Sequence, residues 1–339
     1  MEVDLVQAMR QSVEEMCSEI ECIDSVFEDP RQVGSKLLGL LAGRTDIIAA
    51  SGALASQLEV DGVVLLKNIF ELGEDLNETP QDWLPVPMTW SIARVQMTII
   101  GLNALLQKST ISYRSENDGA LFVNLVGMPG HGYSAEKSQK GLRGHTDAMS
   151  FPFPGDEDPN YENIAPSPDV VCLGALRNPD SVPTTIMPLA SVIKDLDEAT
   201  IEELMKHKYL VTCQDSFEKG TIAVFGRRHS LSEAAVIHLP SNAGYWVRFS
   251  HSKIVAPEKD LNAKNALEKF KLAASRYSKS IPLKPGDVLI VNNRRALHGR
   301  SEVGADTGGS SRWLIRTYGL EEKYAHEHFI EGSSFCLYP

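Results

Sequence analysis

The chain has 339 residues, of which 42% are hydrophobic and 23% charged, so it can bury a substantial core. Its formal net charge of −12 argues against nucleic acid and against an anionic membrane, since both partners need a basic surface. The five cysteines form no CxxC pair, and the acidic N-terminus lacks the apolar core of a signal peptide. No apolar run is long enough to predict a membrane span. We therefore expect a cytoplasmic protein.

The first 110 residues are predicted to be mostly helical. Apolar residues recur at three- and four-residue spacing over 4–27, which indicates an amphipathic helix. A second helix is expected over 31–58 and a third over 90–108. Between them, residues 60–70 have a turn signal followed by a β-branched run, which is typical of a buried strand.

Beyond residue 111 the pattern changes to short strands separated by turns. Strands are predicted over 120–126, 170–175, 185–189, 221–225, 245–249 and 288–292. Helices are expected over 197–207, with Asp197 as N-cap, and over 261–279. This distribution favours a mainly β fold with helical additions around a double-stranded β-helix, or jelly-roll, core. No linker is evident, so residues 1–339 are interpreted as a single domain with its jelly-roll core over 111–320.

The segment over 149–169 is rich in proline and carries the acids Asp156, Glu157 and Asp158. It has no helical or strand periodicity, and such long connections often cover active sites. We expect a lid here, although an ordinary surface connection would have the same composition.

Two short motifs, GHTD at 144–147 and LHGR at 297–300, predict a metal site. Side chains alternate between the two faces of a strand, so His145 and Asp147 can bind one ion together. His298 can complete the set from a neighbouring strand. Two imidazoles and one carboxylate form the facial triad of non-haem iron(II) oxygenases. Of the nine histidines, only His145 has an acidic residue two positions later.

Two arginines follow the distal histidine. Arg312 lies fourteen residues after His298, and Arg316 lies four residues further on. The co-substrate 2-oxoglutarate chelates iron through one end, and its C5 carboxylate needs a cation at the far end of the pocket. A guanidinium suits this task because its rigid fork pairs with a carboxylate through two hydrogen bonds.

The motifs HTD, NNRRALHGR and SSRWLIRTYG together resemble the clavaminate synthase-like branch of Fe(II)/2-oxoglutarate-dependent dioxygenases. This branch includes bacterial hydroxylases of free amino acids. The resemblance implies that His145, Asp147 and His298 ligate iron(II), with 2-oxoglutarate and O₂ as co-substrates. It also implies that Arg312 binds the C5 carboxylate of 2-oxoglutarate and that Arg316 binds the α-carboxylate of the substrate.

The expected reaction is hydroxylation of an unactivated carbon of a free L-amino acid, with lysine preferred to ornithine, arginine or asparagine. The acidic lid would attract a cationic substrate, whereas Ser250 and Ser252 stand where arginine hydroxylases carry acids. Asn124 is a candidate partner for the substrate amino group. An amino acid bound to a carrier is the main alternative substrate.

The sequence departs from the branch at two places: many relatives have Glu at the position of Asp147, and some have a threonine where Gly174 stands. Other interpretations stay open. They are a catalytically silent jelly-roll binding protein, a zinc hydrolase, and an enzyme that desaturates or cyclises its substrate. The oligomeric state is not indicated by the sequence. Arg294, Arg295 and Arg300 are expected to be solvated or salt-bridged.

Overall fold

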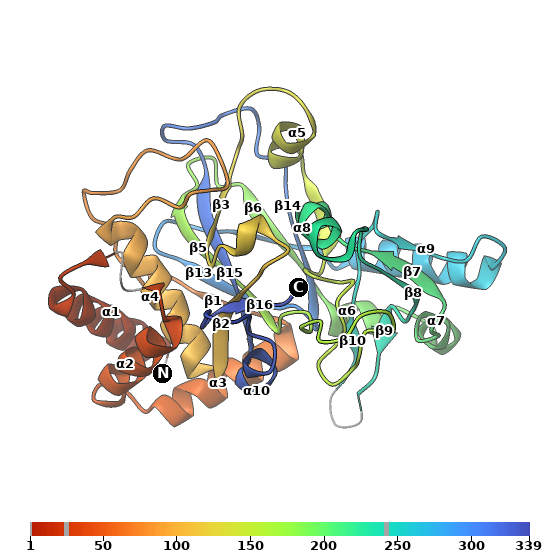
Figure 1. The fold of residues 1–339 in the computed structure, drawn as a ribbon, viewed down its shortest axis with the longest axis horizontal. Coiled ribbons are helices and arrows are strands. Elements are labelled where there is room, and N and C mark those ends of the chain that lie inside the picture. The colour runs from red at the N-terminus through yellow and green to blue at the C-terminus, as the bar shows by residue number, and fades with distance from the viewer. Residues whose placement is uncertain (1, 24–26, 241–243) are drawn as a thin grey trace.

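The computed structural model describes residues 2–23, 27–240 and 244–339 (Figure 1). Its α-helices are α1 Glu2–Glu19, α2 Pro30–Ala42, α3 Ile47–Asp61, α4 Trp90–Leu105, α5 Tyr133–Gln139, α6 Leu189–Lys194, α7 Glu198–Leu204, α8 Asp215–Phe225, α9 Leu261–Arg276 and α10 Glu322–His326. Its strands are β1 Val63–Leu66, β2 Lys108–Tyr113, β3 Val123–Val126, β4 Leu142–His145, β5 Val170–Arg177, β6 Pro183–Pro188, β7 Tyr209–Thr212, β8 Ser230–Ala234, β9 Ile237–His238, β10 Trp246–Val247, β11 Ile254–Val255, β12 Lys279–Pro282, β13 Val288–Asn292, β14 Ala296–Arg300, β15 Trp313–Glu321 and β16 Cys336–Leu337.

Two sheets form the centre of the molecule. The larger has the strand order β1-β13-β5-β15-β2-β16, with β3 also paired to β15, and the smaller has the order β12-β6-β14-β4. Leu289 and Leu314 of the larger sheet share one buried cluster with Ile186 and Ala296 of the smaller sheet. The two sheets therefore pack face to face, and the predicted jelly-roll core is confirmed.

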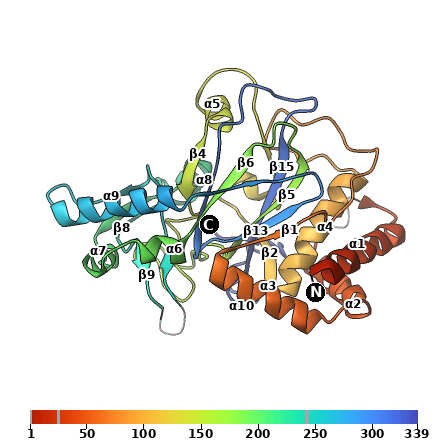
Figure 2. The same cartoon turned by 180° about the vertical axis from the view of Figure 1, so that it is seen from behind.

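The N-terminal helices cover the outer face of the larger sheet (Figures 1 and 2). Strand β15 shows the alternation that this requires. Trp313 and Ile315 lie in the cluster that includes α1, α2 and α4, whereas Leu314 and Tyr318 face the other sheet. Side chains at even-numbered positions from 312 to 318 therefore point into the barrel.

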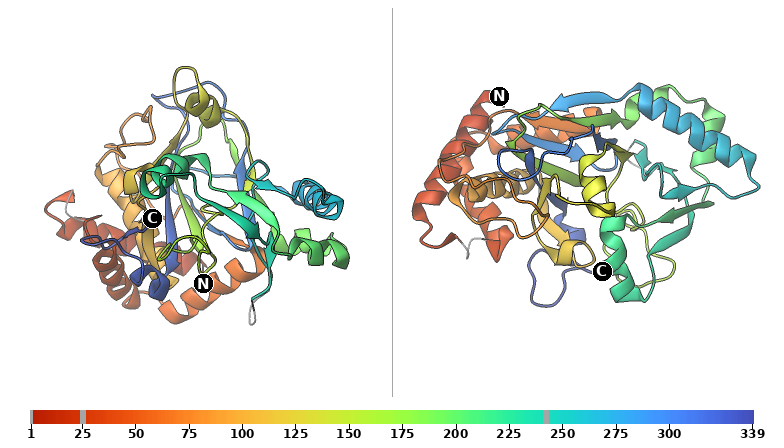
Figure 3. Two further views of the ribbon diagram at one scale, coloured as in Figure 1. Left: turned by 45° about the vertical axis from the view of Figure 1, so that its right-hand side comes forward. Right: turned by 90° about the horizontal axis from the view of Figure 1, so that it is seen from above.

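The chain between β6 and β12 builds an extension on the opposite side of the barrel from α1 and α2. It contains α6, α7, α9 and the small sheet β11-β7-β8, which have their own buried cluster. Figure 3 shows α7 and α9 projecting away from the barrel in both views. Strand β14 connects the two regions, since Leu297 packs in the cluster of the extension.

Most predicted elements are found, with two corrections. The single helix expected over 31–58 is two helices, because Asp46 caps a new helix through its side chain at the amides of Ile48 and Ala49. Residues 221–225, predicted to be a strand, form the end of α8. Phe217 and Thr221 bury one face of this helix, and Gly226 ends it in the left-handed conformation, so tertiary packing overrides the β-branched composition.

The segment over 149–169 is not the expected lid. Phe151 is buried against the rings of Tyr113 and Phe217, and the chain is buried again from Ile164 onward. Asp158 faces inward, where its carboxylate accepts a hydrogen bond from His229 at 2.9 Å. Its packing into the core explains the many apolar residues between its prolines.

A membrane-spanning helix must be long and apolar, and no single described helix meets these requirements. Helices α2 and α3 meet these requirements only as a pair, and they are bent by 117° at the break between them.

Candidate metal centre and active site

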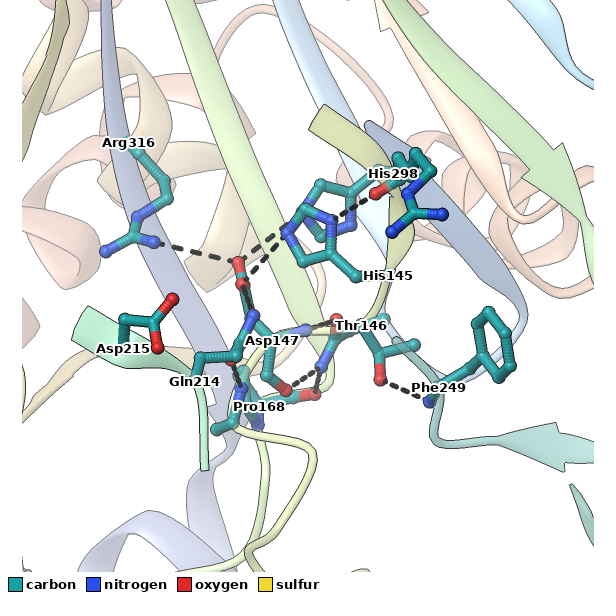
Figure 4. A network of polar contacts seen from close by, with 12 residues as sticks. His145, Thr146, Asp147, Pro168, Gln214, Asp215, Phe249, His298 and Arg316 are labelled. Carbon is teal, nitrogen blue, oxygen red and sulfur yellow. Dashed lines mark hydrogen bonds and ion pairs between the residues drawn. The ribbon is translucent and has the colours of Figure 1, made fainter. Parts of the chain in front are cut away.

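The metal-binding candidates meet where β4 pairs with β14. His145 ends β4 and lies directly opposite His298 in the antiparallel register, with ring centroids 4.4 Å apart. Thr146 continues the extended chain: its amide donates to the carbonyl of Phe249, and its side-chain Oγ1 accepts a hydrogen bond from the Phe249 amide. Asp147 consequently projects to the same side as His145, as the alternation predicted (Figure 4).

The three side chains are close enough to share one ion. One ligand atom from each residue lies within 4.8 Å of the other two, and all three residues are buried. His145 Nε2 and His298 Nε2 each lie 3.5 Å from an oxygen of Asp147. The Asp147 Oδ2 atom is buried and has no hydrogen-bond donor among the described residues. A buried carboxylate oxygen of this kind fits a cation in the space between the three groups.

A second layer of hydrogen bonds fixes the orientation of these ligands. His145 Nδ1 lies 3.0 Å from the carbonyl of Arg143, so it donates there and leaves Nε2 as the lone-pair atom. Gln214 Nε2 donates to Asp147 Oδ1 at 3.0 Å. Asn293 holds the Asp147 backbone from both sides, accepting from its amide at 2.8 Å and donating to its carbonyl at 3.0 Å.

The electrostatics favour the metal-binding protonation states. Burial raises the pKa of Asp147, but the adjacent imidazoles of His145 and His298 and the charge of Arg316 outweigh it and hold this pKa well below its usual range. Burial and the neighbouring His145 lower the pKa of His298. The carboxylate is therefore anionic and the imidazole neutral, which are the forms that bind a divalent ion.

Arg312 is a buried cation without a carboxylate partner. It is 4% exposed, and no ion pair joins it or Arg300 to an acid within the ranges that the structure describes. Burial and the charge of Arg300 lower the pKa of Arg312 to about 9. Arg300 was expected to be solvated or salt-bridged, but its guanidinium is largely buried and, among the described residues, donates to the carbonyls of Lys137 and Lys140. The two guanidiniums together fit the terminal carboxylate of a diacid.

Arg316 has different surroundings. Its Nη2 donates to Glu116 Oε2 at 2.8 Å, its Nη1 lies 3.7 Å from Asp147 Oδ2, and its guanidinium stacks on the ring of Tyr318. Burial lowers the pKa of Arg316, but the charge of Glu116 outweighs it and raises this pKa. Glu116, which the sequence analysis did not identify, is buried beside the cavity.

A cavity of about 420 Å³ opens over this group. Its wall includes His145, Asp147, Glu116 and Arg316, together with residues from α5, the start of α8 and the segment 250–253. No residue of 149–169 is among its lining residues in the described part of the chain. Part of the cavity wall is thus formed by α5, which Figure 1 shows at the top of the molecule.

Two other sequence expectations look different in the structure. Asn124 is fully buried, and its Nδ2 donates to the carbonyls of Asp82 and Pro85 while its Oδ1 accepts from Trp313 Nε1. These bonds tie Asn124 to the fold, and it is not among the described residues that line the cavity. A side chain at Gly174 would meet Val95 of α4. This position faces the helices, so a threonine here would not reach the interior of the barrel.

Comparisons with known proteins agree with this geometry. The family described as "Taurine catabolism dioxygenase TauD, TfdA family" matches residues 106–318. The chain is 25% identical to clavaminate synthase 2 of Streptomyces clavuligerus over 86% of this chain and 82% of that protein. It is 26% identical to the L-lysine 3-hydroxylase of Catenulispora acidiphila over 65% of this chain and 58% of that protein. A crystal structure of an asparagine oxygenase with Fe(II), hydroxyasparagine and succinate superimposes with a TM-score of 0.76 at 18% identity, over 98% of this chain and 97% of that one.

The family match covers more than half of the chain and includes His145, Asp147, His298, Arg312 and Arg316. It confirms the resemblance that the motifs predicted, and it agrees with a metal group made of nitrogen and oxygen ligands. The chain therefore belongs to the TauD/TfdA family and is a non-haem iron(II) dioxygenase that uses 2-oxoglutarate and O₂ as co-substrates.

Proposed function

We propose that the protein hydroxylates a carbon of a free L-amino acid held by Arg316 and Glu116. The observation that carries this proposal is a pair of unused groups in the site. Arg316 Nε and Glu116 Oε1 are both buried and lack hydrogen-bond partners among the described residues. The first is a donor for an α-carboxylate and the second an acceptor for an α-ammonium group, so the pair is complementary to an amino-acid zwitterion.

We assign His145, Asp147 and His298 as the iron ligands and Arg312, assisted by Arg300, as the anchor of the C5 carboxylate of 2-oxoglutarate. Bound iron and 2-oxoglutarate supply the oxidation: O₂, 2-oxoglutarate and the substrate become succinate, CO₂ and the hydroxylated product. The protein's own contribution is positional. Arg312 fixes one end of the co-substrate, and Arg316 with Glu116 fixes the backbone of the amino acid next to Asp147.

Other side chains keep this arrangement rigid and dry. Gln214 and Asn293 hold Asp147 in place from its side chain and its backbone. Tyr318 packs under the guanidinium of Arg316 and donates its hydroxyl to Glu116 at 3.0 Å. Such preorganisation keeps the target carbon at a constant distance from the metal and excludes bulk water from it.

Lysine, the substrate favoured by the sequence, has less support than the zwitterion site. The L-lysine 3-hydroxylase relative acts on this amino acid, and the similarity is 26% identity. The acidic segment that would attract a cation does not line the cavity. Lysine, ornithine, arginine and asparagine are therefore retained as candidates, and a carrier-bound amino acid is the alternative in which Arg316 would meet no free carboxylate.

We also infer that residues 1–339 act as a single dioxygenase domain, since α1, α2 and α4 share a core with the strands that carry the site. A cytoplasmic location is proposed on the basis of the cysteines. Cys172, Cys213 and Cys336 are buried free thiols. Free thiols of this kind fit a reducing compartment.

The test is anaerobic reconstitution with Fe(II), addition of 2-oxoglutarate and O₂, and a panel of free amino acids with their methyl esters. Succinate release and a product heavier by one oxygen atom are measured together. We expect succinate formation to be coupled to hydroxylation of a free amino acid and to be lost with its ester. Hydroxylation of esters alone would contradict the free-acid proposal, and the absence of any hydroxylated product would contradict the choice of an amino acid as substrate.

A further inference from the structure

Arg300 contacts helix α5, which forms part of the wall of the active-site cavity. It lies two residues after His298 on β14, and its Nη2 donates to the carbonyl of Lys140 at 2.8 Å and to that of Lys137 at 3.1 Å. Both carbonyls belong to the C-terminal end of α5, where the last carbonyls of a helix have no partner within the helix. Arg300 therefore holds this end of α5.

Helix α5 depends on contacts of this kind. It has seven residues, and so short a helix is not stable without tertiary contacts. Of its described side chains, Ala135 and Ser138 are buried. Near its end, the carbonyl of Gln139 accepts from the amide of Val303. Arg300 adds two hydrogen bonds and the favourable interaction of a cation with a helix C-terminus, so its position decides how firmly α5 is held.

Arg300 is also close enough to Arg312 for the two charges to interact. Burial and the charge of Arg300 lower the pKa of Arg312, and burial lowers the pKa of Arg300. The Nε atoms of both are buried and have no hydrogen-bond partner among the described residues. Like charges repel strongly in a buried site. Without an anion between them, this repulsion favours displacement of Arg300 toward solvent, because its contact with Lys140 lies on the exposed side.

We propose that 2-oxoglutarate binding is coupled through Arg300 to the position of α5, and thereby to amino-acid binding. This inference rests on the proposed function, in which Arg312 and Arg300 bind the C5 carboxylate. That carboxylate removes the repulsion and keeps Arg300 at the end of α5. Glu136 and Ser138 of α5 line the cavity, so their positions are fixed before the amino acid enters. Arg300 is thus a positioning residue for the amino-acid site.

Such coupling is reciprocal. If 2-oxoglutarate strengthens amino-acid binding by a certain factor, the amino acid strengthens 2-oxoglutarate binding by the same factor, and such factors are typically about 5- to 150-fold. A guanidinium has donors on two edges, so it can bond a carboxylate and the α5 carbonyls together, whereas lysine has one compact ammonium group. Arg300→Lys therefore keeps the charge and removes the bridge.

The first experiment measures hydrogen exchange and needs neither an amino acid nor turnover. The protein is loaded anaerobically with Fe(II), and exchange is compared with and without saturating 2-oxoglutarate. Peptides from α5 report the effect, and peptides from α9 are the internal reference, since no described residue of α9 lines the cavity. We expect 2-oxoglutarate to slow exchange in α5 by roughly fivefold or more and to leave α9 unchanged. Exchange in α5 that does not respond to 2-oxoglutarate would overturn the proposal.

The second experiment measures the coupling in substituted proteins. Each Fe(II)-loaded protein is titrated calorimetrically with lysine, ornithine, arginine and asparagine, with and without saturating 2-oxoglutarate. In the unsubstituted protein we expect 2-oxoglutarate to strengthen binding of the preferred amino acid by about 5- to 150-fold. Arg300→Met and Arg300→Lys should both lose most of this factor, and 2-oxoglutarate should no longer slow exchange in α5. Full coupling in folded Arg300→Met would overturn the proposal. Binding of no amino acid would instead contradict the proposed function, and the exchange experiment would still decide the link to α5.

Arg295→Met is the matched control for these variants. Arg295 lies in the turn just before β14, and its guanidinium is also largely buried, but it pairs with Glu59. Its substitution should leave both the exchange of α5 and the coupling factor unchanged. Thermal unfolding of each variant confirms that it is folded. Loss of the coupling in folded Arg295→Met as well would show that the effect is not specific to Arg300 and would overturn its role.

Discussion

The two ends of the segment from Arg312 to Arg316 offer opposite environments to the same functional group. At one end, Arg312 is buried beside another guanidinium and no acid pairs with it in the described ranges. At the other end, Arg316 is buried between Glu116 and Asp147. Three residues of β15 separate the two, and the alternation of the extended chain places both arginines on one face of the sheet. Burial alone therefore does not define what an arginine binds, because the neighbouring charges decide it.

The difference matches two kinds of ligand. A guanidinium pair without an acid is costly in the empty protein and is relieved by an anion, so it suits a co-substrate with a terminal carboxylate. A guanidinium already paired with one carboxylate is stable without ligand. The unpaired donor Arg316 Nε and the unpaired acceptor Glu116 Oε1 suit a ligand that carries both a negative and a positive charge. One strand can thus distinguish a diacid from a zwitterion.

The largest expected effect comes from the loss of a metal ligand. His298→Ala should abolish iron binding and turnover, because it removes one of three protein bonds to the metal. Anaerobic titration with Fe(II) and succinate release measure the two losses. His326→Ala, in the exposed part of α10, is the control. Iron affinity equal to that of the unsubstituted protein would show that the triad is assigned wrongly.

Replacing Arg312 tests the unpaired end. Arg312→Met should weaken 2-oxoglutarate binding by on the order of 2–5 kcal/mol, or roughly 30- to several-thousand-fold. In the absence of ligand it should stabilise the fold by about 1–3 kcal/mol, because an uncompensated buried charge is removed. Calorimetry with 2-oxoglutarate and denaturant unfolding check the two parts. A variant that binds 2-oxoglutarate normally would refute the anchor role.

Replacing Arg316 should have the opposite effect on stability. Arg316→Met leaves Glu116 buried without its cation, so we expect the free energy of unfolding to fall by about 2–4 kcal/mol. Amino-acid binding should be lost while 2-oxoglutarate binding changes little. The double variant Arg316→Met, Glu116→Gln should recover part of the stability and none of the binding. If Arg312→Met and Arg316→Met changed the free energy of unfolding in the same direction, the proposed distinction between the two ends would be wrong.

The smallest expected effect concerns a buried ion pair outside the cavity, which stabilises the fold and does not contact the ligands. Asp169 pairs with Arg294 and Lys108. Burial raises the pKa of Asp169, but these two cations outweigh it and lower the pKa in the folded state. A lowered folded pKa contributes stability above the unfolded value of about 4, and this is lost as the pH falls. Asp169→Asn should therefore cost about 1–3 kcal/mol near neutral pH and progressively less in acid.

Urea unfolding between neutral and acidic pH measures this dependence, and 2-oxoglutarate binding at neutral pH should be unchanged. Glu59→Gln is the control, because the pair of Glu59 with Arg295 is half exposed and should matter little at any pH. A penalty for Asp169→Asn that grows as the pH falls would contradict the direction of the pKa shift.

The sequence predicted the metal ligands because their signal is local. His145 and Asp147 stand two residues apart in an extended chain, and His298 follows a clear strand and turn. Glu116 carries no comparable signal. Its partner Arg316 is 200 residues away, and only the docking of β15 against the segment after β2 brings the two together. Pairings of this kind depend on the tertiary fold, which periodicity does not encode.

The fold shows the same limit. The helix Leu261–Arg276 was predicted because its burial follows a regular period. The strand Val288–Asn292 is buried at every position, and a short apolar run after a turn signal predicts such a strand. Residues 221–225 were assigned to a strand because Thr, Ile and Val favour one, although Phe217 and Thr221 bury a helical face. The segment over 149–169 was interpreted as a lid from its prolines and acids. Its burial depends on Phe151 finding Tyr113, a contact that composition does not reveal.

The direct pairing of His145 with His298 also sets the order in which the enzyme can mature. Strand β14 lies far along the chain from β4, so a nascent chain that ends shortly after Asp147 holds two of the three ligands and no closed metal site. Tight iron binding becomes possible only after the C-terminal third has been synthesised and has docked. From then on, each tenfold excess of iron over its dissociation constant adds about 1.4 kcal/mol to the native state. Metal acquisition is thus a late checkpoint that selects completely folded molecules.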